Sequence, residues 1–351
     1  MLKGKNVLVA GGAGYIGSVV TAVLLEREAR VVVYDNLQKG HRDAVPDAAH
    51  FVEGDIRDAS KVVETLQQER IDAVVHMAAS SLVGESMTAP DRYYDNNVRG
   101  GLTLLDAMRD AGVPALVFSS TAAVYGDPEA DIIDEAHATT PTNAYGETKL
   151  AFERALQWYG RAHGLRSVSL RYFNAAGAAY GVGERHTPET HLIPLVLRAA
   201  QGGVEGAPLT IYGDDYDTDD GTCIRDYVHV ADLADAHVLA LEALLAQRVG
   251  VAAYNLGNGD GYSVREVIEA AERVTGLRVP VRVGARRPGD PARLVASSAR
   301  IRRELEWSPK RESLDDIIAS AWELVDAMSL VGRVRLRDVD ESAVHLRAGS
   351  D

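Results

Sequence analysis

The sequence predicts an α/β protein built on a doubly wound, Rossmann-like parallel sheet, with a smaller C-terminal α/β substrate-binding cap. Short apolar segments alternate with longer segments of helical periodicity through the first half of the 351-residue chain. This alternation is typical of a parallel sheet that is covered by helices on both faces. A glycine-rich loop separates the first apolar segment from the first helical one. Beyond about Arg171, prolines and glycines interrupt the alternation and indicate a different architecture.

The predicted elements follow from these patterns. The strands of the first half are Val7–Ala10, Val31–Tyr34, His50–Glu53, Ala73–Met77, Ala115–Ser119 and Ser167–Arg171, and its helices are Ser18–Glu28, Ala59–Glu69, Asn97–Ala111 and Tyr145–His163. In the second half, strands are predicted at Leu209–Tyr212 and Ala253–Leu256, and helices at Val264–Thr275 and Leu314–Met328. We therefore expect a dinucleotide-binding domain over 1–173, a cap over 174–329 that is interleaved with returns to the main sheet, and an extended or disordered tail over 330–351.

Composition excludes several classes of function. The chain is 46% hydrophobic, and its net charge is 37 − 51 = −14, so no basic face is evident and nucleic acid is not an expected partner. The single cysteine, Cys223, allows no intrachain disulfide and is expected to be a packing residue. No apolar run approaches the ~20 residues of a membrane span. The first strand begins too early to leave room for a signal peptide, so we expect a cytoplasmic protein without membrane contact.

The glycine loop predicts a dinucleotide site. Gly11, Gly14 and Gly17 follow the first strand and precede the first helix. In that position glycines permit a tight turn, the approach of a diphosphate to the backbone and close packing of the helix on the strand. Asp35 ends the second strand, where a carboxylate accepts the adenosine ribose hydroxyls and repels a 2′-phosphate. NAD is therefore favoured over NADP, and Asp55-Ile56, after the third strand, is expected beside the adenine.

Tyr145 and Lys149 predict acid/base chemistry. Residues four apart share one face of a helix, and a phenol has a pKa of ~10, which makes it a poor base at neutral pH. A nearby ammonium stabilises the phenolate and lowers that pKa. Together with a bound dinucleotide, the pair indicates removal of an alcohol proton coupled to hydride transfer. Thr121, in the cluster Ser119-Ser120-Thr121 after the fifth strand, is the candidate hydroxyl beside Tyr145, although such clusters more often cap helices.

Two charged segments remain. The acidic stretch between Gly213 and Arg225 is interpreted as a solvated loop, because it places Asp220 where a calcium loop needs glycine and lacks its final glutamate; no metal is expected. Arg225, Arg286 and Arg287 are candidates for binding a diphosphate, since guanidinium groups match phosphate oxygens in geometry.

The motifs together resemble the extended short-chain dehydrogenase/reductases and, within them, the UDP-glucose 4-epimerases. The resemblance runs from about Asn6 to Ala327. Glycine loop and Tyr-x-x-x-Lys motifs identify only the wider family. The more specific stretches are residues 171–178 (RYFNAAGA), 219–227 (DDGTCIRDY) and 286–290 (RRPGD).

The resemblance implies a role for each site residue. Tyr145 would be the acid/base, Lys149 its partner and Thr121 its hydroxyl helper. The residues expected to hold NAD are Gly11, Gly14, Tyr15, Ile16, Gly17, Asp35, Asn36, Asp55, Ile56, Met77, Ala78, Asn97, Lys149 and Tyr172. The residues expected to line the UDP-sugar site are Thr121, Asn174, Leu192, Tyr212, Arg225, Arg287, Asp290 and Leu294.

The resemblance also implies a reaction, a partner and some alternatives. UDP-glucose and UDP-galactose would be interconverted, with UDP-N-acetylglucosamine and UDP-xylose/arabinose as alternative substrates and Leu294 setting the room for an N-acetyl group. Dehydration is disfavoured because Ala122-Ala123 replace the acid/base pair that a 4,6-dehydratase needs. A non-catalytic NAD(P)-sensing module and a dehydrogenase that releases NADH are the other classes. A homodimer is expected through helices near Tyr93–Ala111 and Tyr145–His163.

Overall fold

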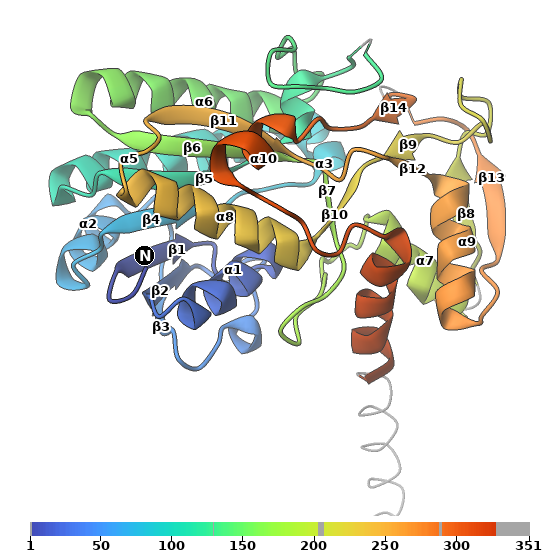
Figure 1. Ribbon diagram of the computed structural model, residues 1–351, viewed down its shortest axis with the longest axis horizontal. Coiled ribbons are helices and arrows are strands. Elements are labelled where there is room, and N and C mark those ends of the chain that lie inside the picture. The colour runs from blue at the N-terminus through green and yellow to red at the C-terminus, as the bar shows by residue number, and fades with distance from the viewer. Residues whose placement is uncertain (1, 129, 203–206, 288–289, 328–351) are drawn as a thin grey trace, which may run out of the picture.

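A seven-stranded parallel sheet forms the centre of the computed structural model, which describes residues 2–128, 130–202, 207–287 and 290–327 (Figure 1). The strand order is β11-β6-β5-β4-β1-β2-β3, so the direction of winding reverses between β1 and β4. Such a reversal opens a crevice at the carboxyl ends of the strands. The strands are β1 (Asn6–Ala10), β2 (Arg30–Asp35), β3 (His50–Glu53), β4 (Ala73–His76), β5 (Ala115–Thr121), β6 (Arg166–Tyr172) and β11 (Val251–Leu256).

Helices cover both faces of the sheet (Figure 1). On one face α1 (Tyr15–Glu26) packs beside α8 (Val230–Leu245), and on the other α2 (Ala59–Gln68), α5 (Gly100–Ala111) and α6 (Ala144–His163) lie in sequence. Alternate residues of each central strand supply the two cores, since successive side chains of a strand point to opposite faces. Val7 and Val9 of β1 join the core under α1 and α8, whereas Leu8 joins the core under α2 and α5.

The cap lies beside the carboxyl edge of the sheet and has its own core (Figure 1). It contains a parallel pair, β8 and β13, and a three-stranded sheet in the order β12-β9-β14. Helices α7 and α9 pack against each other there. The elements are α7 (Leu192–Ala200), β8 (Leu209–Tyr212), β9 (Ile224–Arg225), β12 (Tyr262–Ser263), α9 (Val264–Thr275), β13 (Val281–Gly284) and β14 (Arg293–Leu294).

Short elements connect these two regions. A parallel pair of β7 and β10 leads from the sheet into the cap and back. The remaining elements are η1 (Arg42–Ala44), α3 (Val83–Thr88), α4 (Pro90–Tyr93), the π-helical turn η2 (Tyr94–Arg99), the 3₁₀ turn η3 (Ala122–Tyr125), β7 (Asn174–Ala176), β10 (Tyr227–His229) and α10 (Ala299–Leu305). In the described part of the chain, no helix is both long enough and apolar enough to cross a membrane.

The predicted fold class is confirmed, and the predicted strands lie within two residues of the observed ones. Several boundaries differ, among them the start of α1, which lies at Tyr15 where Ser18 was predicted. The helix expected over Asn97–Ala111 begins as the π-helical turn η2, and the fifth strand continues through Thr121 rather than ending before it. The last predicted helix is observed over 314–327; its final residue, Met328, and the tail at 330–351 lie outside the described residues.

Candidate functional site

A cavity of about 1370 Å³ opens at the carboxyl ends of β1, β2, β4, β5 and β6 and extends to the cap. Most of the residues predicted for the two ligands line it. Those on the sheet side are Gly11, Gly14, Tyr15, Ile16, Gly17, Asp35, Asn36, Ile56, Met77, Ala78, Thr121, Tyr145, Lys149 and Tyr172, and those on the cap side are Asn174, Leu192, Tyr212, Arg225, Arg287 and Asp290. One continuous cavity thus contains the expected cofactor and substrate positions.

The glycine loop is too tightly packed for side chains at two of its positions. Gly11 has a φ of +83°, and a Cβ there would lie 2.4 Å from the backbone nitrogen of Ala78. A Cβ on Gly17 would lie 2.2 Å from the carbonyl oxygen of Gly11. Helix α1 starts at Tyr15, and Gly14, its N-cap, makes no side-chain capping bond. The amides of its first turn are therefore oriented toward the cavity edge, as a diphosphate requires.

Asp35 is fixed at the end of β2, beside the glycine loop. Its carboxylate accepts hydrogen bonds from the amides of Ala13 at 3.0 Å and Leu37 at 2.8 Å. Burial raises the pKa of Asp35, and these two bonds offset the increase in part. The carboxylate also lines the cavity, so the structure places it where the sequence predicted a ribose-binding group.

Tyr145 and Lys149 lie on one face of α6, against the end of β5. The Thr121 hydroxyl acts as a donor toward the Tyr145 phenol, and its Oγ1 accepts from the amide of Ala123 at 3.1 Å. Lys149 donates from Nζ to the carbonyl oxygen of Ser119 at 2.8 Å. Thr121 therefore has both of the roles considered for it, as the N-cap of η3 and as the hydroxyl beside the phenol.

Burial opposes the charged form of both groups. It raises the pKa of Tyr145 to about 12, although the hydrogen bond from Thr121 lowers it in part. Burial lowers the pKa of Lys149 to about 7, against the opposing effect of the Glu153 carboxylate. The chain alone thus keeps the phenol protonated at neutral pH. A further positive charge at the site would be needed to stabilise its phenolate.

The cap side of the cavity carries two paired arginines. Arg225 forms an ion pair with Asp290, and the guanidinium of Arg287 lies 4.0 Å from the centre of the Tyr212 ring. Asn174 lines the same wall and is held by hydrogen bonds to the carbonyl oxygen of Asp226. Cys223, half-buried, also borders the cavity, and burial raises the pKa of its thiol. Guanidinium groups match phosphate oxygens in geometry, and an aromatic ring next to them can stack on a nucleobase.

Four predicted residues lie elsewhere. Asp55 is paired with Arg57 at 2.6 Å, and this bond lowers the pKa of its carboxyl. Asn97 is 4% exposed and bonds Ser80 and Thr148 instead of lining the cavity. Leu294 packs with the cluster around Tyr125 and does not line the cavity. Arg286 pairs with Asp215 at 2.6 Å, away from the cavity lining. Sequence position located these residues but not the direction of their side chains.

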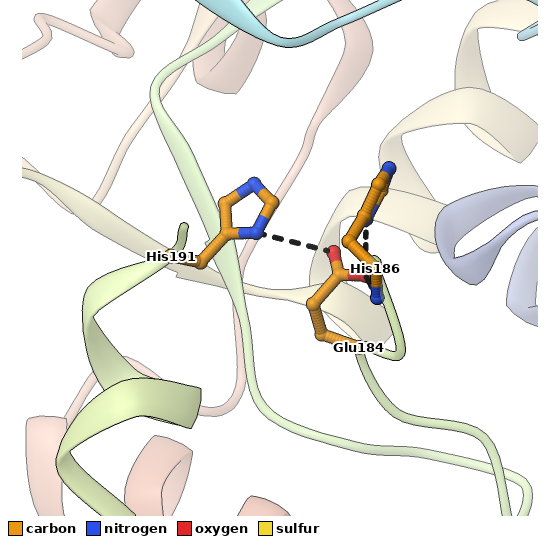
Figure 2. Close-up of side chains that lie close together, drawn as sticks. All are labelled: Glu184, His186 and His191. Carbon is orange, nitrogen blue, oxygen red and sulfur yellow. Dashed lines mark hydrogen bonds and ion pairs between the residues drawn. The ribbon is translucent and has the colours of Figure 1, made fainter. Parts of the chain in front are cut away.

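A cluster of carboxylates and imidazoles in the segment between β7 and α7 was not predicted. The Nδ1 atoms of His186 and His191 both point toward the carboxylate of Glu184 (Figure 2). The potential ligand atoms of these three residues lie within 4.8 Å of one another, which makes the cluster a possible metal site. His191 also bonds Glu189 at 2.8 Å. The signal in the sequence is two histidines and two glutamates within eight residues.

The segment that carries this cluster contacts the sheet domain across the cavity. Arg185 makes a two-pronged ion pair with Asp43, at 2.9 and 3.0 Å, and Lys39 donates to the carbonyl oxygen of Thr187 at 3.3 Å. Burial raises the pKa of Tyr15, and the charges of Glu184 and Glu189 raise it further. The segment therefore closes one side of the predicted cofactor site.

Comparisons with known proteins agree with this geometry. The model of the NAD dependent epimerase/dehydratase family matches residues 7–257. A UDP-glucose 4-epimerase of Corynebacterium glutamicum is 51% identical over 323 residues, which are 92% of this chain and 96% of that protein.

Solved structures are similar over the same length. The UDP-glucose 4-epimerase of Brucella ovis in complex with NAD is 49% identical, with a TM-score of 0.87 over 91% of this chain and 98% of that one. The UDP-glucose 4-epimerase of Bifidobacterium longum in complex with NAD+ and UDP is 38% identical, with a TM-score of 0.86 over 91% and 98%.

Gly17→Ala is expected to abolish retention of NAD, because the new methyl group would clash with the carbonyl oxygen of Gly11 and change the shape of the glycine loop. The NAD content of the purified protein, measured after denaturation, tests this. Gly250→Ala is the matched control, since no atom lies within 4 Å of a Cβ at that position. Equal NAD content in the two variants would contradict the assignment of the loop.

His191→Gln is expected to lower thermal stability more at acidic than at basic pH. Burial alone would lower the pKa of His191, but the bond to Glu189 and the charge of Glu184 outweigh burial and raise it. Stabilisation from a raised pKa is complete below the unfolded value of about 6.5 and is lost as pH rises through the folded value. Melting temperatures of both proteins from pH 5.5 to 9 measure this, with His163→Gln, at the exposed end of α6, as control. A difference in melting temperature that stays constant across this pH range would contradict the raised pKa of His191.

Proposed function

The chain belongs to the NAD-dependent epimerase/dehydratase family, and from this premise we propose that it interconverts UDP-glucose and UDP-galactose by reversible oxidation at C4 of the sugar. The observation that carries the proposal is the arrangement of Tyr145, Lys149 and Thr121 at one end of a cavity that continues into the arginine-lined cap. The relatives at about 50% identity are UDP-glucose 4-epimerases, and solved neighbours contain NAD.

The chemistry divides between the chain and its cofactor. NAD, when bound, accepts the C4 hydride and returns it. Tyr145 takes the proton from O4 and later gives it back, while Thr121 hydrogen-bonds the reacting oxygen. Lys149 and the positive nicotinamide would together lower the raised pKa of the phenol. Residues Gly11, Gly14, Gly17 and Asp35 hold the cofactor in this proposal.

Epimerisation requires that the substrate be held by its nucleotide while the sugar turns over. The UDP contacts we propose are those of Asn174, Leu192, Tyr212, Arg225, Arg287 and Asp290. Their position on the cap, across the cavity from Tyr145, supports a fixed diphosphate and a free 4-keto sugar. The cap would correspond to residues 174–329 and the NAD-binding domain to 1–173.

Dehydration, the other activity named for the family, is not favoured. It needs an acid/base pair directly after the catalytic hydroxyl, where this chain has Ala122 and Ala123. Both alanines belong to the short turn η3 next to Thr121. Their methyl groups cannot move a proton.

Tyr145→Phe is expected to keep its fold and its NAD but to lose about 10²–10⁴-fold in activity, the usual contribution of a general acid/base. Steady-state conversion of UDP-galactose to UDP-glucose measures the loss. Tyr159→Phe is the matched control, because this tyrosine lies on the same helix and bonds Asp106 at its outer side. A loss below about tenfold would exclude Tyr145 as the base.

The size of the sugar that the site accepts is set near Phe173 and Leu294 in this proposal. Leu294 and Phe173 both pack against the buried cluster of Val124, Tyr125, Ile133 and Leu150, and Phe173 lines the cavity. We propose that Leu294 sets the room for an N-acetyl group indirectly, by fixing the position of the Phe173 ring. Leu294 itself does not line the cavity.

Leu294→Tyr is expected to reduce activity on UDP-N-acetylgalactosamine far more than on UDP-galactose. Overfilling a packed cluster costs about 1–3 kcal/mol, which corresponds to one or two decades in rate if the displaced ring enters the larger sugar's space. Rates on both substrates, for both proteins, decide the matter. Parallel losses would show that Leu294 does not discriminate between sugars.

A homodimer formed through α3, η2 and α6 is also proposed. Met87, Tyr94 and Trp158 are 61%, 45% and 65% exposed, and these three elements pack side by side. Leu105 and Met108, in the first of the two helical segments expected to form the interface, are instead buried in the core of the subunit. A cytoplasmic location stays a prediction from the sequence.

Trp158→Glu is expected to convert the dimer to monomers, because a carboxylate would be buried without a partner in the proposed interface. Light scattering at micromolar concentration gives the mass of each protein. Val281→Glu, at an exposed apolar residue of the cap, is the control. A wild-type protein with the mass of one chain would contradict the proposal.

A further inference from the structure

Helix α6 presents a third functional side chain on the face that carries Tyr145 and Lys149. Glu153 lies four residues beyond Lys149 and is 5% exposed. The last three residues of β5 hold these three side chains one by one. Ser119 accepts from Lys149 at 2.8 Å, Ser120 donates to Glu153 at 2.5 Å, and Thr121 bonds Tyr145.

A buried arginine fixes the Glu153 carboxylate from the other side. Arg171 of β6 donates from Nε to both carboxylate oxygens, at 3.0 and 3.2 Å, and from Nη2 at 2.5 Å. Its Nη1 donates to the hydroxyl of Tyr125 at 3.0 Å, and Tyr125 donates to Asn255 at 2.7 Å. The network therefore ties α6 to the ends of β5, β6 and β11 directly behind the cavity.

We propose that Glu153 is a positioning residue of the acid/base site, whose carboxylate keeps Lys149 in its ammonium form and keeps α6 in register with the end of β5. This inference rests on the proposed function, since it assigns Lys149 the task of stabilising the Tyr145 phenolate. Glu153 itself does not line the cavity and acts through Lys149.

Electrostatics at Lys149 support this role. Burial lowers the pKa of Lys149 to about 7, and the charge of Glu153 is the influence that raises it. The titratable and charged groups that interact with Lys149 are Tyr145 and Glu153 on α6 and His76 on β4. Three more act through its neighbours: Arg171 of β6 binds Glu153, and Tyr172 of β6 and His237 of α8 bond Ser119. Burial lowers the pKa of His76 to about 3 and that of His237 to about 4, so both rings are neutral at physiological pH.

The neighbours thus leave one negative charge to hold the proton on Lys149. Tyr145 and Tyr172 are neutral while their pKa values stay raised by burial, and Arg171 is positive. Among the described residues around Lys149, Glu153 supplies the carboxylate. If it were neutral, the ammonium would lose its proton at a lower pH, and the phenol would lose the cation that makes it a base.

The test is the titration of Lys149 in the NAD-loaded Glu153→Gln protein. The chain contains six lysines, so ¹⁵Nζ resonances are few and Lys149→Met identifies the one required. We expect the pKa of Lys149 to fall by about one unit, and the rise of kcat/KM with pH to move to higher pH, with about a tenfold loss near neutrality. Glu147→Gln, at an exposed position on the same helix, should change neither.

Glu153→Gln leaves Arg171 buried without its counter-charge and can destabilise the fold. A second variant therefore separates this structural effect from the effect of Glu153 on the pKa of Lys149. Glu153→Met/Arg171→Met removes both charges together and should still lower the pKa of Lys149. An unchanged titration in a folded variant, or an activity loss that is uniform across pH, would overturn the proposal. The NMR titration needs no turnover, so a wild-type protein inactive on UDP-sugars would refute the proposed function alone.

Discussion

The register between the end of β5 and three turns of α6 is the constraint on which the rest of the site depends. Ser119, Ser120 and Thr121 each hold one side chain of the helix, and these side chains recur every four residues. The pairing works because successive residues of the strand offer a carbonyl, a hydroxyl and a second hydroxyl to a helix face whose repeat is close to a whole turn. A shift of α6 by one residue would remove Tyr145 and Lys149 from the cavity together.

The same constraint explains why the site is buried on one side and open on the other. Tyr145 and Lys149 are 8% and 3% exposed, and burial opposes the charge of both. The chain by itself therefore leaves the Tyr145 phenol protonated at neutral pH. An added positive charge at the site would ionise the phenol and allow it to act as a base. The cap faces this point with guanidinium groups and closes part of the cavity with the segment around Glu184 and Arg185. In the proposed function, proton transfer and anchoring of the diphosphate would thus be separated in space, as the turning over of a tethered sugar requires.

The features that could be predicted from the sequence are those that depend on a local pattern of residues. The alternation of strands and helices gave the sheet, and Asp35 and Tyr145 could be placed because a strand end and a helix repeat fix them. Helix α8 was not predicted, because it is mostly apolar and twelve of its sixteen residues are buried, which leaves little periodicity. Asn97 and Leu294 do not line the cavity, and the cluster of Glu184, His186 and His191 was not predicted, since the surroundings of these residues come from segments that are distant in the sequence. Glu153 lies at a readable helix spacing, but its partner Arg171 belongs to a strand and is found only in the folded chain.

In the proposed reaction the C4 hydrogen leaves and returns within one site while the O4 proton passes through Tyr145. The most direct measurement is conversion of UDP-galactose deuterated at C4, in ordinary water, followed by mass spectrometry of the UDP-glucose formed. We expect the deuterium to be retained at C4 of the product, because NAD held at this site would supply a hydride acceptor and donor that does not exchange hydrogen with water. Replacement of the deuterium by hydrogen from water would contradict the account and would indicate deprotonation at carbon instead.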